Sequence, residues 1–417
     1  MNRALRWGML LSVLMCGVFA ASRARAEGEN KSKFDFYGFI MMDAGYNDQG
    51  IDPQWFDVQR PTKLATIKDG WGKDGNTFFS ARQTRFGVKS TTATDMGELF
   101  TQFEWEMFGV GADAGQTTIR LRHAYGQLGK WGAGQTWSPF MDIDVFPNTL
   151  EYWGPNGMAF FRNVQIRYMP IQGDTRMTIA LERPGASADA GDIADHYNLG
   201  AVKPLFPLPD LSAEYRKAIS KGYVEVAGIV REIKWQDTDP APPDNKGDVV
   251  GWGLSLSSNL KFGKDVLRLQ GVYGEGIENY FNDAPVDVGV ETSTDPTKPI
   301  DAKALPITGI VAFLDHVWNP KFSSSVGYSS VTIDNSSGQG PDAYKMGQYV
   351  LANLLYTPVP NVMMGIEGGW IHRENKTEGV SVVFAPTGVS GKTEKVDQYH
   401  VQVSAKYSFA LPLSGGQ

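Results

Sequence analysis

The sequence predicts an all-β fold: a membrane-spanning, antiparallel, up-and-down β-barrel of about sixteen strands with one loop folded inward as a constriction. Three observations lead to this prediction. Segments of about ten residues alternate apolar and polar side chains along most of the chain. The connections between these segments are short and long in strict alternation. The chain also begins with the pattern of a secretory signal.

The alternating segments are the predicted strands. In the segment 118–125, alternation divides the side chains into two faces, with Ile119, Leu121, His123 and Tyr125 on one and Thr118, Arg120 and Arg122 on the other. About ten residues at a tilt are enough for a strand to cross a bilayer. We predict strands at 34–46, 80–90, 97–108, 118–125, 133–140, 161–168, 176–182, 209–217, 223–233, 251–258, 266–276, 307–318, 323–332, 347–357, 362–373 and 397–409.

The connections between the predicted strands decide the topology. Short connections fall near 91–96, 129–132, 170–174, 218–221, 262–265, 319–321 and 358–361. Long connections fall near 47–77, 109–117, 139–160, 184–208, 236–248, 276–304, 333–345 and 374–395. A barrel with short periplasmic turns and longer outer loops predicts this rhythm and places both termini in the periplasm. A soluble β-sandwich or lectin also alternates, but without this rhythm or strands of this length.

The first residues read as a secretory signal peptide. Arg3 and Arg6 precede an apolar run, residues 7–20, that is too short to span a bilayer. Cleavage after Ala26 fits the small side chains at 24 and 26, and a cut after Ala20 is the alternative. The predicted organisation is a signal peptide (1–26), an outer-membrane β-barrel (27–409) and a C-terminal tail (410–417).

Composition and charge exclude several classes of protein. Cys16 is the only cysteine and lies in the predicted signal peptide, which excludes disulfides, thiolate metal sites and cysteine catalysis in the mature chain. Removing residues 1–26 takes away four arginines and no acid, so the formal net charge changes from −7 to −11. An acidic chain is a poor candidate for binding nucleic acid. We expect neither a cofactor nor a metal, since Asp142-x-Asp144 lacks the turn spacing of a calcium loop.

Four segments together resemble the DcaP-like trimeric porins of Gram-negative outer membranes. They are SARQTRFGVKS (80–90), LRHAYGQLG with GQTWSPFMD (121–142), GPNGMAFFRNVQIRY (154–168) and LLYTPVPNVMMGIEGGWIHRENK (354–376). The resemblance implies a sixteen-stranded homotrimer in contact with outer-membrane lipid and lipopolysaccharide. It also implies passage of small, usually anionic solutes, with dicarboxylates a proposed class. Some members carry a coiled coil before the barrel, whereas residues 27–33 are too few for heptad pairing.

The candidate site is the pore constriction. We expect residues 141–160 to fold into the lumen and to carry Asp142, Asp144 and Glu151. Facing them we expect Arg85, Arg120, Arg122 and Arg167, with the facing of Arg82 and Arg162 left open. Arginine suits carboxylate ligands because its planar fork donates two parallel hydrogen bonds. The alternative is that these arginines pair structurally with Glu98, Glu104 and Glu106 on the neighbouring strand.

The predicted function is passive diffusion of small hydrophilic, anionic solutes through a water-filled pore, without enzymatic activity. A barrel enzyme, either a protease or a phospholipase, is the first alternative and needs a nucleophile or activated water near a histidine and a carboxylate. The five histidines are scattered, with His123 and His372 predicted to face outward or lie near the rim and His400 to face inward. A receptor or adhesin acting through the long loops is the other alternative.

Overall fold

The computed structural model describes residues 32–68, 72, 74–110, 118–191, 199–239, 245–293, 300–384 and 389–413. The predicted signal peptide and residues 414–417 of the predicted tail lie outside this range. Within the described range, no helix has the length and apolar character needed to cross a membrane.

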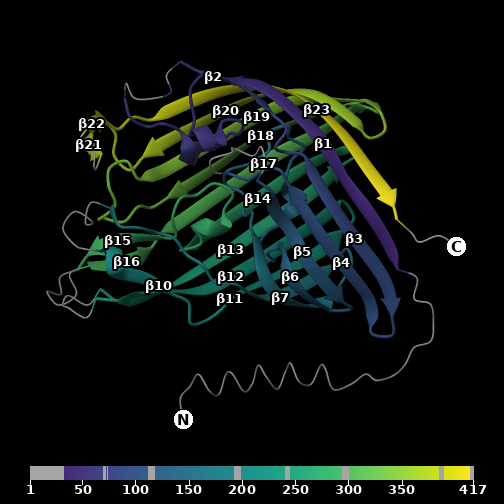
Figure 1. Cartoon of the computed structure of the whole chain (residues 1–417), viewed down its shortest axis with the longest axis horizontal. Helices are drawn as coiled ribbons and strands as arrows, with labels where there is room; N and C mark the ends of the chain where they lie inside the picture. The colour runs from purple at the N-terminus through teal and green to yellow at the C-terminus, as the bar shows by residue number, and fades with distance from the viewer. Residues whose placement is uncertain are drawn as a thin grey trace, which may run out of the picture.

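A closed antiparallel barrel of sixteen strands makes up most of the chain (Figure 1). The wall consists of β1 (Lys33–Asn47), β3 (Arg85–Thr94), β4 (Gly97–Glu106), β5 (Arg120–Leu128), β6 (Trp131–Trp137), β7 (Arg162–Ile171), β8 (Arg176–Glu182), β11 (Asp210–Ile219), β12 (Gly222–Asp237), β13 (Gly247–Phe262), β14 (Asp265–Glu275), β17 (Pro306–Asn319), β18 (Phe322–Ile333), β19 (Tyr344–Val359), β20 (Val362–Asn375) and β23 (Val396–Pro412). Sequential strands pair with each other, and β1 closes the ring by pairing with β23. The predicted up-and-down barrel is confirmed.

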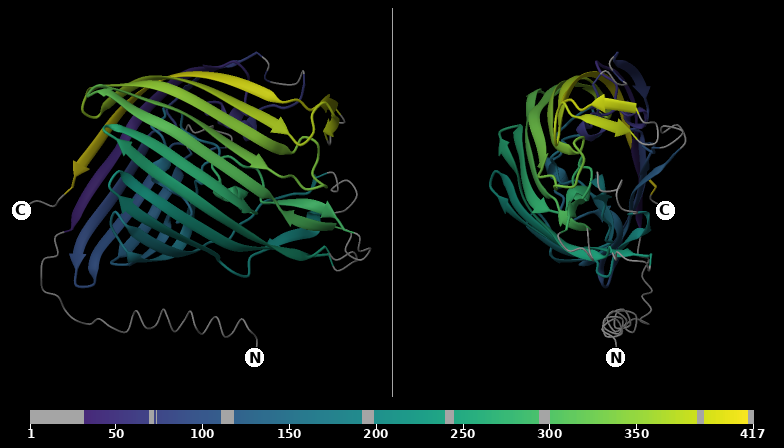
Figure 2. Two further views of the ribbon diagram at one scale, coloured as in Figure 1. Left: turned by 180° about the vertical axis from the view of Figure 1, so that it is seen from behind. Right: turned by 90° about the vertical axis from the view of Figure 1, so that its left-hand side faces the viewer.

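The shorter strands lie at the long-loop end of the barrel (Figures 1 and 2). Two more strands, β2 (Asn76–Ser80) and β10 (Val202–Leu205), extend the main sheet beside β1 and β12. A small three-stranded sheet contains β9 (Ala188–Asp189), β15 (Val288–Thr292) and β16 (Ile300–Ala304). A two-stranded sheet contains β21 (Ser381–Phe384) and β22 (Val389–Lys392). Short 3-10 turns are η1 (Pro53–Trp55), η2 (Pro61–Lys63), η3 (Ile143–Val145), η5 (Leu199–Ala201) and η6 (Glu278–Tyr280).

Most strand bounds differ from the predicted ones by a few residues, and two of the differences change an element more than that. The predicted strand 80–90 is interrupted at residues 81–84, where β2 ends and Arg82 turns inward to pair with Asp57. The ion pair with Asp57 and a hydrogen bond to the carbonyl oxygen of Gln54 hold the Arg82 side chain where the ladder is interrupted. The last strand runs past Phe409 to Pro412, because those residues continue the ladder with β1.

The two faces of the wall follow the predicted alternation over most of the barrel. Leu254 is 56% exposed and Val403 is 49% exposed, whereas their neighbours Ser255 and Ser404 are buried. An apolar outer face is the surface that lipid requires.

The prediction for His123 was wrong, because a register shift lies between Glu104 and Trp105 where β4 pairs with β5. A bulge of this kind adds one residue to β5 and changes the phase of the alternation. His123 and Tyr125 are therefore buried rather than facing outward, while Leu121 keeps its outward position with 40% exposure.

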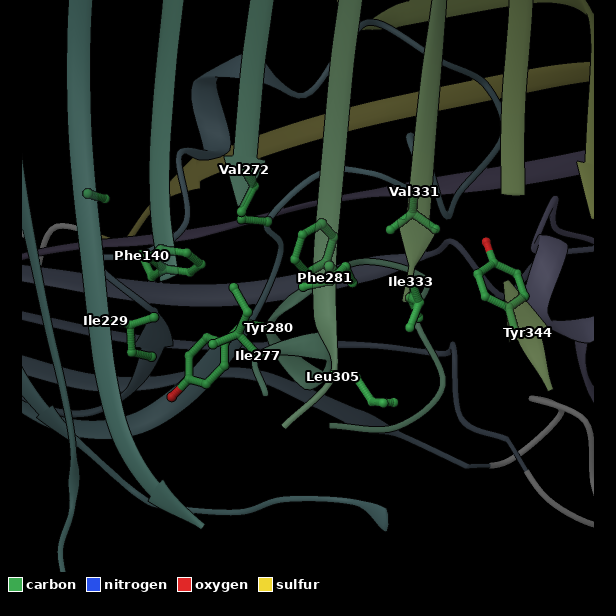
Figure 3. Packing of buried hydrophobic residues seen from close by; sticks show 13 residues of the cluster. Phe140, Ile229, Val272, Ile277, Tyr280, Phe281, Leu305, Val331, Ile333 and Tyr344 are labelled. Atoms are coloured by element: carbon green, nitrogen blue, oxygen red, sulfur yellow. The ribbon is translucent and has the colours of Figure 1, made fainter. Parts of the chain in front are cut away.

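Apolar cores lie between the wall and the segments inside it. The largest cluster joins Phe140 of the β6–β7 connection and Ile277, Tyr280 and Phe281 around η6 to inward side chains of the wall (Figure 3). The wall side chains are Ala227, Ile229, Val272, Ile307, Val331 and Ile333. This packing explains why inward positions of β12 to β18 include apolar residues. These apolar side chains hold the β6–β7 connection and the segment around η6 in place, and the two segments fill that side of the lumen.

Candidate pore constriction

The connection between β6 and β7, residues 138–161, folds into the barrel as predicted. Main-chain groups of this constriction loop bind inward side chains of the wall: Gly157 N donates to Ser329 Oγ (2.9 Å) and Ala159 N to Gln270 Oε1 (3.0 Å). Val145 and Met158 are fully buried in a cluster with Phe313 and Tyr349 of the wall. The constriction loop is therefore attached to the side of the barrel formed by β13 to β20.

A cavity of about 500 Å³ lies between the constriction loop and the opposite wall. Five basic side chains line it, namely Arg85, Arg120, Arg122, Arg162 and Lys406. Glu151 is the one acidic residue that lines it within the described range. Positive charge therefore exceeds negative charge around this part of the lumen.

Two of the five basic residues are engaged by buried carboxylates. Arg122 places Nε 2.6 Å from Glu104 Oε1 and Nη1 2.6 Å from Glu106 Oε2. Arg85 places Nη2 3.1 Å from Glu106 Oε2. The side chain of Arg122 is only 5% exposed, which leaves little of its guanidinium for a solute. For Arg122, the structure has the pairing that the alternative interpretation expected.

The other three basic residues are freer. Arg120 has a side chain that is 36% exposed, with its nearest carboxylate, on Glu106, 4.0 Å away. Lys406 places Nζ 4.1 Å from the centre of the Phe39 ring, and it forms no ion pair with any described residue. Arg162 lies over Trp137 and has one buried nitrogen, Nη1, without a hydrogen-bond partner. These three cations can meet a solute.

The sequence alone does not assign Lys406 to the site, and it leaves the facing of Arg162 open. The signal for Lys406 was its place on the polar face of the last predicted strand, together with Gln402 and Ser404. Nothing in the alternation distinguishes a lumen lysine at the constriction from one elsewhere along the pore.

Arg167 does not line the cavity. Its Nε donates to Gln165 Oε1 (3.0 Å), its Nη2 to the carbonyl oxygen of Trp137, and its guanidinium lies 5.4 Å from the Tyr125 ring centre. It pairs across the sheet with Gly132, near the short turn between β5 and β6. Its inward facing is as predicted, but its height along the barrel separates it from the constriction.

The two aspartates of the constriction loop face the opposite side of the lumen from the basic cluster. Asp142 accepts hydrogen bonds from Arg216 Nη2 (2.6 Å), Tyr223 Oη (2.7 Å) and Ser257 Oγ (2.6 Å). Asp144 pairs with Arg216 and lies 3.9 Å from Arg176. They attach the loop to β11, β12 and β13. Asp144 also lines a second cavity, of about 790 Å³, between the loop and these strands.

Glu151 points away from the pore into the protein. Its oxygens accept the main-chain N–H groups of Gln59 (3.0 Å), Trp153 (2.7 Å) and Gly154 (2.7 Å). Burial raises the pKa of Glu151 to about 8, against the opposing effect of these hydrogen bonds. Next to it, Tyr152 donates to Glu106 and stacks on Phe108 with ring centres 3.8 Å apart. The loop thus contacts both sides of the lumen at this point.

The buried histidines have structural partners. His123 Nδ1 lies 3.0 Å from Thr136 Oγ1, and His400 Nδ1 lies 2.6 Å from Asn47 Oδ1. His400 faces inward as predicted. His372, in β20, lies 2.9 Å from Asp397 and is 8% exposed. None of the three lines the basic cavity.

Comparison with known proteins gives one family and several solved structures of the same fold. A family model described as "DcaP outer membrane protein" matches residues 20–264. The crystal structure of the outer membrane channel DcaP of Acinetobacter baumannii has 20% identity and a TM-score of 0.72, covering 92% of this chain and 99% of that one. A comparison with curated protein sequences found no match.

Two more distant structures share the fold. An anion-selective porin from Comamonas acidovorans has 9% identity and a TM-score of 0.54, with coverage of 91% of this chain and 100% of that one. The trimer form of OmpT, an outer membrane protein of Vibrio cholerae, has 13% identity and a TM-score of 0.53, with the same coverage. The family match spans more than half of the chain and agrees with the sixteen-stranded barrel. The chain therefore belongs to the DcaP outer membrane protein family and is a channel protein of the Gram-negative outer membrane.

Proposed function

We propose that the pore passes small hydrophilic anions, with carboxylates and dicarboxylates as the solute class. The observation that carries this proposal is the basic cavity beside the constriction loop, where five cationic side chains meet a single carboxyl that points away from the pore. Glu104 and Glu106 compensate part of this charge through Arg85 and Arg122. Arg120, Arg162 and Lys406 remain to attract an anion.

The chemistry of these groups suits carboxylates in transit. Arg120 can offer a planar pair of N–H donors, and Lys406 a compact ammonium, to an anion that has left part of its hydration shell. Both side chains lie against aromatic rings, Trp153 and Phe39, which hold them without neutralising their charge. Because they remain partly hydrated, binding is weak enough for the solute to leave, as conduction requires.

A channel explains this site better than an enzyme. Catalysis on a barrel needs a nucleophile or activated water within reach of a histidine and a carboxylate. The histidines near the constriction loop are engaged with Thr136 and Asn47 and do not line the cavity. The cavity instead presents cationic side chains, which attract anions.

We propose further that three copies associate through the wall from β3 to β8. β6 and β8 have seven residues each, whereas β12 and β13 have sixteen. Seven residues at a tilt reach about 18 Å across the bilayer, less than the apolar band of about 25 Å on a membrane barrel. A neighbouring copy would cover this short wall, and outer-membrane lipid and lipopolysaccharide would meet the taller strands.

Block of ionic current tests the proposed solute class. In a planar bilayer, a small dicarboxylate should reduce the current through the open pore at concentrations where a neutral solute of similar size has little effect. The reason is that each charge-assisted hydrogen bond contributes about 1.5–3 kcal/mol before screening. The block should also weaken as salt is raised. Equal block by the charged and neutral solutes would contradict the proposal.

A further inference from the structure

Two buried carboxyl groups hold the innermost part of the constriction loop against the wall. Glu367 of β20 accepts the main-chain N–H groups of Leu150 and Glu151, both at 2.7 Å. Glu151 accepts those of Gln59, Trp153 and Gly154. Both side chains are 1% exposed, and within the described range neither forms an ion pair with a basic residue. Hydrogen-bond donors alone compensate these carboxyls.

The two carboxyls differ in whether they can accommodate a proton. Glu151 Oε2 lies 3.1 Å from the hydroxyl of Tyr349. A hydroxyl can rotate and accept instead of donating, so protonated Glu151 keeps this partner. This fits a group whose pKa burial raises to about 8.

Glu367 has no such freedom. Its third donor is Asn353 Nδ2, at 2.9 Å from Oε2. The amide of Asn353 cannot flip, since its Oδ1 accepts Ser325 N (2.8 Å) and its Nδ2 also donates to Asn148 O (2.7 Å). Every polar contact of Glu367 is therefore a donor of fixed orientation. A proton on Glu367 finds no acceptor among these contacts, and it removes the negative charge that strengthens all three hydrogen bonds.

We propose that Glu367 is a positioning residue for the constriction and acts as an acid-released latch on residues 150–154. Ionised Glu367 holds the loop against β19 and β20, and protonation releases it. The titratable groups that face Glu367 are Glu151 of the loop, Asp43 of β1 and Tyr349 of β19. Two of these are acids, so a proton arriving at this cluster is not repelled by a neighbouring cation.

Release narrows the pore. The wall lies behind the loop, so the freed segment can move only into the cavity of about 500 Å³, which Thr149, Glu151 and Tyr152 already line. Several contacts oppose this movement. The fully buried side chain of Leu150 packs with Met41 and Leu355, and Tyr152 donates a hydrogen bond to Glu106. Gln83 and Gln402 donate to the carbonyl oxygen of Leu150, and Trp153 exchanges two hydrogen bonds with Asn282. Protonation should therefore produce closures from an otherwise open pore.

Single-channel recording of the purified protein in a planar bilayer tests the latch. As the pH is lowered from about 9 to about 4, a window wide enough to include the titration of a buried carboxyl, the open probability should fall several-fold. Glu367→Gln replaces an acceptor oxygen by an N–H donor. It should close often at neutral pH and respond little to further acidification, with unchanged ion selectivity while open. Unchanged open probability in the wild type on acidification would overturn the proposal.

Two further variants keep the test decisive. Glu182→Gln is the matched control, because Glu182 is equally buried but accepts only from the hydroxyls of Ser138 and Ser212, which can rotate. It should keep the wild-type response to pH. Leu150→Cys with Leu355→Cys tests the latch with Glu367 intact, since these side chains share one cluster and the predicted mature chain has no other cysteine. Joining the two by a short thiol cross-linker should abolish the acid closures. Closures that persist in the cross-linked protein would also overturn the proposal.

Discussion

Neutralising Arg120 and Lys406 together should remove most of the anion preference of the pore. The double variant Arg120→Gln, Lys406→Gln keeps hydrogen bonding and much of the size but takes away two cations that line the cavity. Neither residue has a short ion pair, so little structural cost is expected. Block by a dicarboxylate should weaken by about tenfold or more for each charge-assisted bond lost, because about 1.4 kcal/mol corresponds to a factor of ten.

The control for this variant changes the same number of charges away from the constriction. Lys221 and Lys321 lie in short turns and are exposed, so Lys221→Gln with Lys321→Gln alters net charge equally without touching the cavity. This control should keep the wild-type selectivity. Similar losses in both variants would mean that net charge, rather than the basic cavity, sets the preference.

Arg122→Gln should instead destabilise the barrel. Arg122 compensates Glu104 and Glu106 together, and all three side chains are less than 10% exposed. Removing one partner of a buried ion pair costs about 3–5 kcal/mol, and here Arg85 would remain as the nearest counter-charge of both carboxylates. The temperature at which the folded barrel unfolds, followed by its mobility in detergent gels, should fall clearly. Arg120→Gln, on the same face of the same strand, should leave it nearly unchanged.

Comparing Arg120→Gln with Arg122→Gln separates two roles, solute binding and structural ion pairing, between which the sequence does not decide for these arginines. If Arg122→Gln folds with wild-type stability, its ion pairs contribute little and the assignment of Arg122 as a structural residue is wrong. If Arg120→Gln unfolds as readily as Arg122→Gln, Arg120 also stabilises the barrel, and its assignment as a residue that is available to solutes is wrong.

The barrel could be predicted from the sequence because its signal is local. A period of two along each strand assigns Leu254 outward and Ser255 inward without knowledge of any distant residue, and the structure confirms both. The alternating short and long connections fix the order of neighbours, which is the only long-range information an up-and-down barrel requires.

The site could be predicted only in part, because facing does not determine partners. Arg120 and Arg122 share one face of β5, yet one is partly exposed and the other is held by two carboxylates of β4. Asp142 was expected to face the basic wall, but it binds Arg216 and Tyr223 from strands about 80 residues further along the chain. The path of a loop across a lumen depends on such distant contacts, which no local period encodes.

The phase of alternation also failed where the backbone left its regular pattern. The bulge opposite Glu104 turned His123 inward, and the inward turn at Arg82 divided a predicted strand. Both irregularities accompany buried charge that has to be compensated. Local sequence gives the charges but not the partners that make the irregular backbone favourable.

The reversal potential of the wild-type pore across a salt gradient tests the central claim most directly. With KCl at different concentrations on the two sides of a planar bilayer, the basic cavity predicts a reversal potential of the sign that chloride permeation gives. Its magnitude should fall as total salt rises, because salt screens the partly exposed cations. A potential near zero, or one of the sign that potassium permeation gives, would contradict the assignment of this barrel as an anion-conducting pore.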